Sequence, residues 1–133
     1  MLKSPAIKVS HEFLGFAREI KECISREKEV KTCPITINQG VLRTCISRAY
    51  YSVFLMARHI MDLDYYDRPD VHRIVIDRLK DMELRDIADK LFKLRQERNR
   101  ADYDIHVNFT KNRVCYIVSI AESLLKELEK HLK

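Results

Sequence analysis

The densest polar chemistry of this chain lies between residues 94 and 106, where a long helical pattern gives out. Arg95, Arg98 and Arg100 carry planar, permanently charged guanidinium groups, which suit phosphate. Asn99 adds an amide, and His106 adds a titratable ring. The combination indicates phosphate chemistry, in which the arginines bind the anion and His106 moves a proton.

The same residues also have a purely structural interpretation. Acidic side chains alternate with the arginines, at Glu97 and Asp102 among others. Arg98 would then pair with Glu97 or Asp102 in an exposed salt bridge that contributes little free energy. Asn99 would cap a helix terminus, and His106 would be a loop residue. The pattern alone leaves both interpretations open.

Composition favours one all-α domain over residues 1–133. The chain is 46% hydrophobic and 34% charged, with only two glycines and three prolines, which is typical of long amphipathic helices. A net charge of +5 and a pI of about 9.1 permit nucleic acid or another polyanion as a partner. The charge is spread along the chain, so it does not identify that partner.

Cysteine and histidine usage argues against a disulfide framework or a metal. Cys23, Cys33, Cys45 and Cys115 form no Cys-x-x-Cys pair, and no secretory signal pattern is present. We therefore expect reduced cysteines in a cytoplasmic protein. The five histidines are scattered, so no metal and no cofactor is expected. Because no apolar run approaches the roughly 20 residues that span a bilayer, no membrane partner is expected either.

Hydrophobic periodicity predicts five helices joined by short connections. The first helix is expected to begin at an N-cap, Ser10, and to end near Val30. The next three are expected over about residues 39–61, 69–80 and 83–100. The last is expected to run from a cap at Asn108 or Thr110 to near the terminus. Four long helices and one short one favour a helical bundle.

The second helix, residues 39–61, has an unusually wide apolar face. Tyr50 and Tyr51 fall within it and are expected to pack in the core or at an interface. Its width predicts a central helix with several neighbours and, because some apolar surface would remain uncovered, a homodimer. Arg43 and Arg48, with Arg58, leave a basic edge that could face the arginines of residues 94–106.

Two strings on predicted helices carry a family resemblance. The first is Ser47-Arg48-Ala49-Tyr50-Tyr51-Ser52-Val53-Phe54, and the second, some forty residues later, is Leu94-Arg-x-x-Arg98-Asn99-x-Ala101-Asp102-Tyr103. Together they resemble the HEPN family of small prokaryotic helical proteins, over roughly residues 10–132. The resemblance implies an antiparallel, up-and-down four-helix bundle with an added short helix. It also implies a homodimer, often partnered by a minimal nucleotidyltransferase in a toxin–antitoxin operon.

Many HEPN proteins are metal-independent endoribonucleases with an Arg-x4-6-His motif. Here Arg98-Asn99 matches the start of the motif, but His106 lies eight positions after Arg98, beyond the motif's range. At the shortest spacing that the motif allows, this chain has Tyr103 instead of histidine. Counted from Arg100, five residues precede His106. The Ala-Asp-Tyr ending resembles a branch that commonly lacks the histidine.

Two functional hypotheses follow from this resemblance. In the first, the protein acts on RNA, as the endoribonuclease or toxin of a pair. Its catalytic candidates are Arg98, Asn99, Arg100 and His106, and its nucleic-acid-binding candidates are Arg95, Arg98 and Arg100. In the second, it is a non-catalytic module that binds a nucleotide or the nucleotidyltransferase.

Three further residues are predicted to have no part in a site. His72, on the short basic third helix, is expected to be a solvated surface histidine. Cys45 and Cys115 fall on apolar helix faces, where a reduced cysteine acts as a small hydrophobe.

Overall fold

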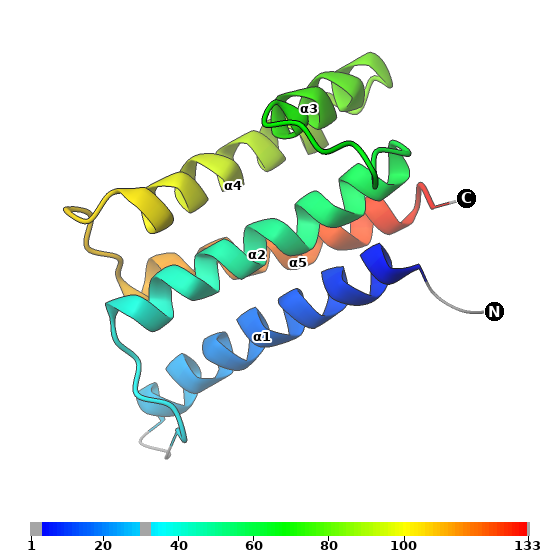
Figure 1. Cartoon of the computed structure of the whole chain (residues 1–133). Coiled ribbons are helices and arrows are strands. Elements are labelled where there is room, and N and C mark those ends of the chain that lie inside the picture. The colour runs from blue at the N-terminus through cyan, green and yellow to red at the C-terminus, as the bar shows by residue number, and fades with distance from the viewer. Residues whose placement is uncertain (1–3, 30–32, 133) are drawn as a thin grey trace.

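The computed structural model describes residues 4–29 and 33–132, and in that part of the chain it contains five helices and no strand. The all-α class is therefore confirmed. The helices are α1 (Pro5–Lys28), α2 (Gln39–Ile60), α3 (Val71–Asp81), α4 (Arg85–Tyr103) and α5 (Lys111–Glu129). Figure 1 shows the four long helices side by side, with successive ones running in opposite directions and α3 near the start of α4.

Helix α2 lies at the centre, as its wide apolar face predicts, and packs against all four other helices. Its buried residues include Ile46, Tyr50, Val53 and Met56, each with no exposed surface. The prediction that Tyr50 packs in the core is confirmed. Because α1, α4 and α5 cover this face within one chain, its width no longer argues for a homodimer. The homodimer stays a prediction.

Helix α1 begins earlier than the sequence pattern predicts. Ser4 is its N-cap, accepting a hydrogen bond from the Ala6 amide at 3.1 Å, and Pro5 occupies the first turn. Ser10, the predicted cap, is instead fully buried inside the helix, where its hydroxyl donates to the Ser52 carbonyl of α2. A tertiary hydrogen bond of this kind cannot be predicted from local sequence. The predicted end at Val30 lies outside the described residues; α1 ends at Lys28.

The limits of the later helices were predicted to within a few residues. α3 begins at Val71, two residues after Pro69. The Asp70 carbonyl accepts from the Ile74 amide in the helical pattern, whereas the Arg68 carbonyl accepts from the Val71 amide in a tighter turn. α4 extends three residues beyond Arg100, and the Asp104 amide still donates to the Arg100 carbonyl. For α5, Thr110 is the cap.

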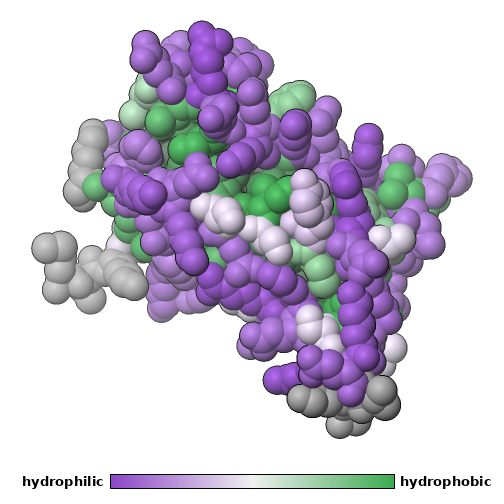
Figure 2. Space-filling view, turned by 180° about the vertical axis from the view of Figure 1, so that it is seen from behind, coloured by the Kyte–Doolittle hydropathy of each residue, from purple (hydrophilic) through white to green (hydrophobic). Residues whose placement is uncertain are grey.

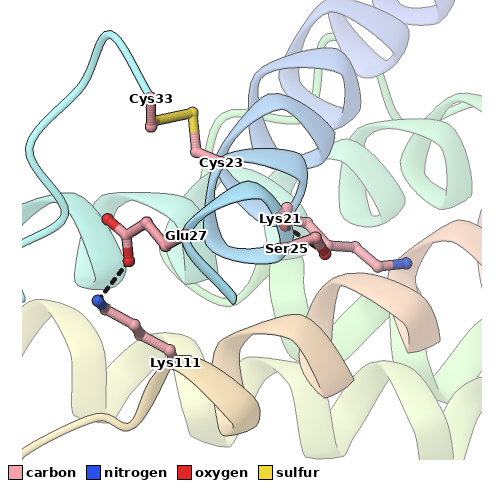
Figure 3. Close-up of a disulfide and its surroundings, with 6 residues drawn as sticks. All are labelled: Lys21, Cys23, Ser25, Glu27, Cys33 and Lys111. Carbon is pink, nitrogen blue, oxygen red and sulfur yellow. Dashed lines mark hydrogen bonds and ion pairs between the residues drawn. A yellow bond between two sulfur atoms is a disulfide. The ribbon is translucent and has the colours of Figure 1, made fainter. Parts of the chain in front are cut away.

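The prediction of four reduced cysteines is wrong for one pair. Cys23 on α1 and Cys33 in the α1–α2 connection form a disulfide, with Cα atoms 5.3 Å apart (Figure 3). Near it, Glu27 pairs with Lys111 at the start of α5. The spacing of ten residues gave no motif, because only the fold of the connection brings the two side chains together. Cys45 and Cys115 are free, and Cys45 is buried as predicted.

Within the described ranges, no helix is both long enough and apolar enough to cross a membrane.

Candidate phosphate-binding site between helices α2 and α4

The two sequence strings meet in space at Arg98. Its Nη2 donates to the Tyr51 hydroxyl of α2 at 2.6 Å, and its Nη1 donates to the Asn99 side-chain oxygen at 2.9 Å. Its Nε lies 2.8 Å from Asp102 Oδ2, out of line for a hydrogen bond, so this contact is an ion pair. Only 13% of the Arg98 side chain is exposed. The structural interpretation of Arg98 is thus correct in its pairing with Asp102.

This pairing still leaves Arg98 able to bind an anion. A guanidinium has five N–H groups, and each terminal nitrogen uses one of its two here. The group lies over the rings of Tyr51 and Tyr103, at 5.0 and 5.4 Å from their centres. Held on several sides, it is a preorganised donor with free N–H groups.

Two more arginines stand beside Arg98 without a carboxylate partner in the described structure. Arg48 on α2 lies between the rings of Phe13 and Tyr51, and hydrogen bonds only the Ser47 hydroxyl. Arg95 is half-buried, and its Nε is enclosed without a hydrogen-bond partner. Burying charge without a counter-ion costs free energy, so the cluster of Arg48, Arg95 and Arg98 is suited to an anionic ligand.

His72 also belongs to this site, and the prediction of a solvated surface histidine is wrong. Its ring stacks on Phe54 at 4.2 Å between centres, and its Nδ1 is 2.6 Å from the Tyr50 hydroxyl. Burial, followed by the nearby charges of Arg95, Arg98 and Arg58, lowers its pKa from 6.5 to about 4. Burial also raises the pKa of Tyr50, so its hydroxyl is the donor and His72 is neutral near pH 7.

A helical period on α3 could have revealed the burial of His72. Val75, Ile76 and Leu79, the buried residues of α3, lie three, four and seven positions after it, which puts all four on one face. Ile74, two positions after His72, lies off this face and is only half-buried.

His106 lies in the connection between α4 and α5, which Arg43 holds in place. Arg43 Nη1 donates to the carbonyls of Ala101 at 3.0 Å and Asp104 at 2.9 Å, and Nη2 donates to the carbonyl of Val107. The part of the basic edge at Arg43 therefore does face residues 94–106. The role of Arg43 there is to donate hydrogen bonds to carbonyls at the end of α4 that have no helical partner.

His106 and Asp102 line one open hollow of about 390 Å³. The His106 side chain is exposed, and its backbone amide donates to Asp104 Oδ1 at 3.1 Å. Among the described residues, no hydrogen bond joins the His106 side chain to Arg98 or Arg100. Arg98 is connected to the hollow through Asp102, which it pairs with.

Arg100 points to another side of α4. Two positions correspond to about 200° around a helix, so Arg98 faces α2 while Arg100 faces α5. There Arg100 Nη1 lies 3.8 Å from Glu97 Oε1, and Glu97 also pairs with Arg113 of α5. Asn99 is exposed within α4 and caps no terminus. The structure thus groups Arg95, Arg98 and Asn99, places His106 at the edge of that group, and separates Arg100 from it.

Other reactive groups lie outside this site. Burial raises the pKa of the Cys45 thiol to about 12, which leaves it protonated and unreactive. Among the described residues, no group of three histidine, cysteine or acidic side chains is placed to hold a metal ion.

Comparisons with known proteins agree with the site's two strings. An uncharacterized protein of Methanocaldococcus jannaschii is 33% identical over 117 residues, which covers 70% of this chain. The chain spans 64% of that relative's length. A family model described as the HEPN domain matches residues 27–131, a segment that contains both strings and helices α2 to α5. The chain belongs to the HEPN domain family.

Proposed function

We propose that this protein binds single-stranded RNA, with phosphates held by Arg48, Arg95 and Arg98. Membership of the HEPN family supports an RNA-related role. The observation that carries the proposal is that Arg48 and Arg95 lie half-buried beside Arg98 without a carboxylate partner in the described structure. The Tyr103 ring, 72% exposed next to Arg98, offers a surface on which an unpaired base can stack.

A salt titration tests this binding. Each arginine that neutralises a phosphate of a single strand contributes about 0.7 to the slope of log affinity against log salt. Arg95→Gln should weaken RNA binding and reduce that slope by about this amount. Lys80→Gln, on the exposed end of α3, makes the same charge change away from the site and serves as control. The proposal fails if the wild type does not bind, or if both variants bind equally.

The hollow shared by His106 and Asp102 favours a second proposal, metal-independent cleavage of the bound RNA. His106 would take the proton from a 2′-hydroxyl, whose oxygen forms a bond to phosphorus. The bond from phosphorus to the 5′ oxygen of the next nucleotide breaks, that oxygen takes a proton from solvent, and a cyclic phosphate is left. Arg98, with its free N–H groups, would stabilise the charge on the phosphoryl oxygens.

Cleavage of a labelled RNA pool in EDTA tests this step. His106→Ala should lower the rate about 100-fold or more, the usual loss for a general base, without changing the melting temperature. The matched control is His11→Ala, which removes an exposed histidine on α1, away from the hollow. Arg98→Ala is assayed with its melting temperature, because it also loses the contacts to Tyr51 and Asp102. If wild type leaves the pool intact, or His106→Ala cleaves normally, the protein is a binding module.

The remaining expectations extend these proposals. The packing of α1, α2, α4 and α5 supports an antiparallel, up-and-down four-helix bundle with α3 as the added helix. A toxin–antitoxin setting with a minimal nucleotidyltransferase partner, and a homodimer, are proposed from the family resemblance alone.

A further inference from the structure

A second basic surface lies between α4 and α5, on the side of α4 away from Arg98. Residues Lys90, Lys93, Glu97 and Arg100 recur every three or four positions along α4 and form one wall of a groove. Arg113, Tyr116 and Ile120 of α5 recur at the same spacing and form the other wall. The groove has a volume of about 550 Å³. Figure 2, in which α5 is turned toward the reader, shows hydrophobic and near-neutral residues along this face between hydrophilic margins.

The charge of the groove is positive. Four cationic side chains line it, against the single carboxylate of Glu97. Glu97 has 9% of its surface exposed and binds both Arg113 and Arg100, so it fixes these two guanidinium groups at the same end of the groove. Lys93 is exposed and has no ion pair within the described residues. The groove therefore offers both fixed and free cations to an anion.

The groove also has an aromatic surface. Tyr116 is 58% exposed in its wall, and the Arg113 guanidinium lies 5.8 Å from the centre of its ring. The floor is apolar, because Leu94 and Ile117 are buried beneath it. An aromatic ring above an apolar floor, flanked by lysine and arginine, suits a ligand that alternates flat bases with phosphates. An acidic peptide would use the cations but not the exposed ring.

We infer that this groove holds a segment of single-stranded RNA, with a base stacked on Tyr116 and phosphates on Lys93 and Arg100. The inference rests on the proposed function and assigns Arg100 to strand binding, away from the Arg98 cluster. Arg100 and Arg113 lie at the end of the groove nearest the α4–α5 connection, which carries His106. A strand in the groove thus leads toward the hollow of His106 and Asp102.

Fluorescence anisotropy with a labelled single-stranded RNA of about twelve nucleotides tests the inference. Tyr116→Ala should weaken binding about tenfold, the usual effect of one lost stacking contact, and leave the salt slope unchanged. Lys93→Gln should weaken binding and reduce the slope by about 0.7, because one phosphate contact is lost. Both residues are exposed, so melting temperatures should match that of the wild type.

Matched controls separate a local effect from a general one. Tyr65→Ala removes a tyrosine that is 99% exposed in the α2–α3 connection, and Lys80→Gln removes an exposed lysine on α3. Neither should change the affinity. If Tyr116→Ala and Lys93→Gln bind as these controls do while Arg95→Gln is weakened, the groove inference is overturned and the proposed function stands. A wild type that binds no RNA overturns both and leaves the groove to an acidic protein partner.

Discussion

Replacing His72 with phenylalanine should make the stability of this protein less sensitive to mild acid. The folded protein holds His72 neutral with a pKa of about 4, against 6.5 ordinarily, because the ring is partly buried on Phe54. Three arginines, Arg58 of α2 and Arg95 and Arg98 of α4, add to the cost of a proton on the ring. Phenylalanine keeps the stacking surface but cannot titrate.

The sign of the effect follows from proton uptake. Between pH 6.5 and pH 4 the unfolded chain binds a proton at His72 that the folded chain does not, so stability falls as pH falls through this window. Above it both states are neutral, and below it both are protonated. The full shift corresponds to a loss of about 2 kcal/mol between pH 7 and pH 5. Because the ring is only half-buried, solvent screening reduces the expected loss to about 1 kcal/mol.

Urea unfolding at pH 7 and pH 5, in parallel for wild type and His72→Phe, measures this loss. Carboxylates also titrate in this range, but they do so in both proteins and cancel in the comparison. The variant also loses the partner of the Tyr50 hydroxyl, at a cost that is the same at both pH values. Equal losses of stability in the two proteins between pH 7 and pH 5 would refute the assignment of a neutral, half-buried His72.

Two further predictions concern the elements around the site. Cys33→Ser removes the link to Cys23 across a separation of ten residues and should lower the free energy of unfolding by about 3 kcal/mol in urea. Cys115→Ser, the control, should change it by less than about 0.5 kcal/mol; equal midpoints would mean that the disulfide does not form. Arg43→Met leaves the carbonyls at the end of α4 without their donor, so hydrogen exchange should speed up around His106 but not in α1. Unchanged protection there would show that Arg43 does not hold the connection.

Local pattern predicted the helices well because each long helix buries one continuous face. Periodic apolar residues identified α2 as the central helix, and Tyr50 is fully buried there. The predicted start of α1 was wrong because the local sequence around Ser10 is typical of an N-cap. In the structure the Ser10 hydroxyl instead donates a hydrogen bond to the Ser52 carbonyl of a neighbouring helix. The Cys23–Cys33 disulfide was missed because its geometry depends on the path of the chain after α1.

The candidate site was predicted in its residues but not in its geometry. Side-chain type is enough to select Arg98 and His106 as groups that bind phosphate and move protons. It does not show that Arg98 is held by Tyr51, which lies 47 positions away. It also does not show that His72 joins the arginine cluster from a third helix.

The all-α class, the central helix and the family could be predicted from the sequence, because helical periodicity and the two strings are local patterns of residues. Which cations act together depends on how the helices pack. Arg98 and Arg100 are two positions apart in the chain, yet α4 directs one toward α2 and the other toward Glu97 and α5. Because a helix turns about 100° per residue, closeness in sequence does not place side chains on one face, and only the packing of the helices shows what each face contacts.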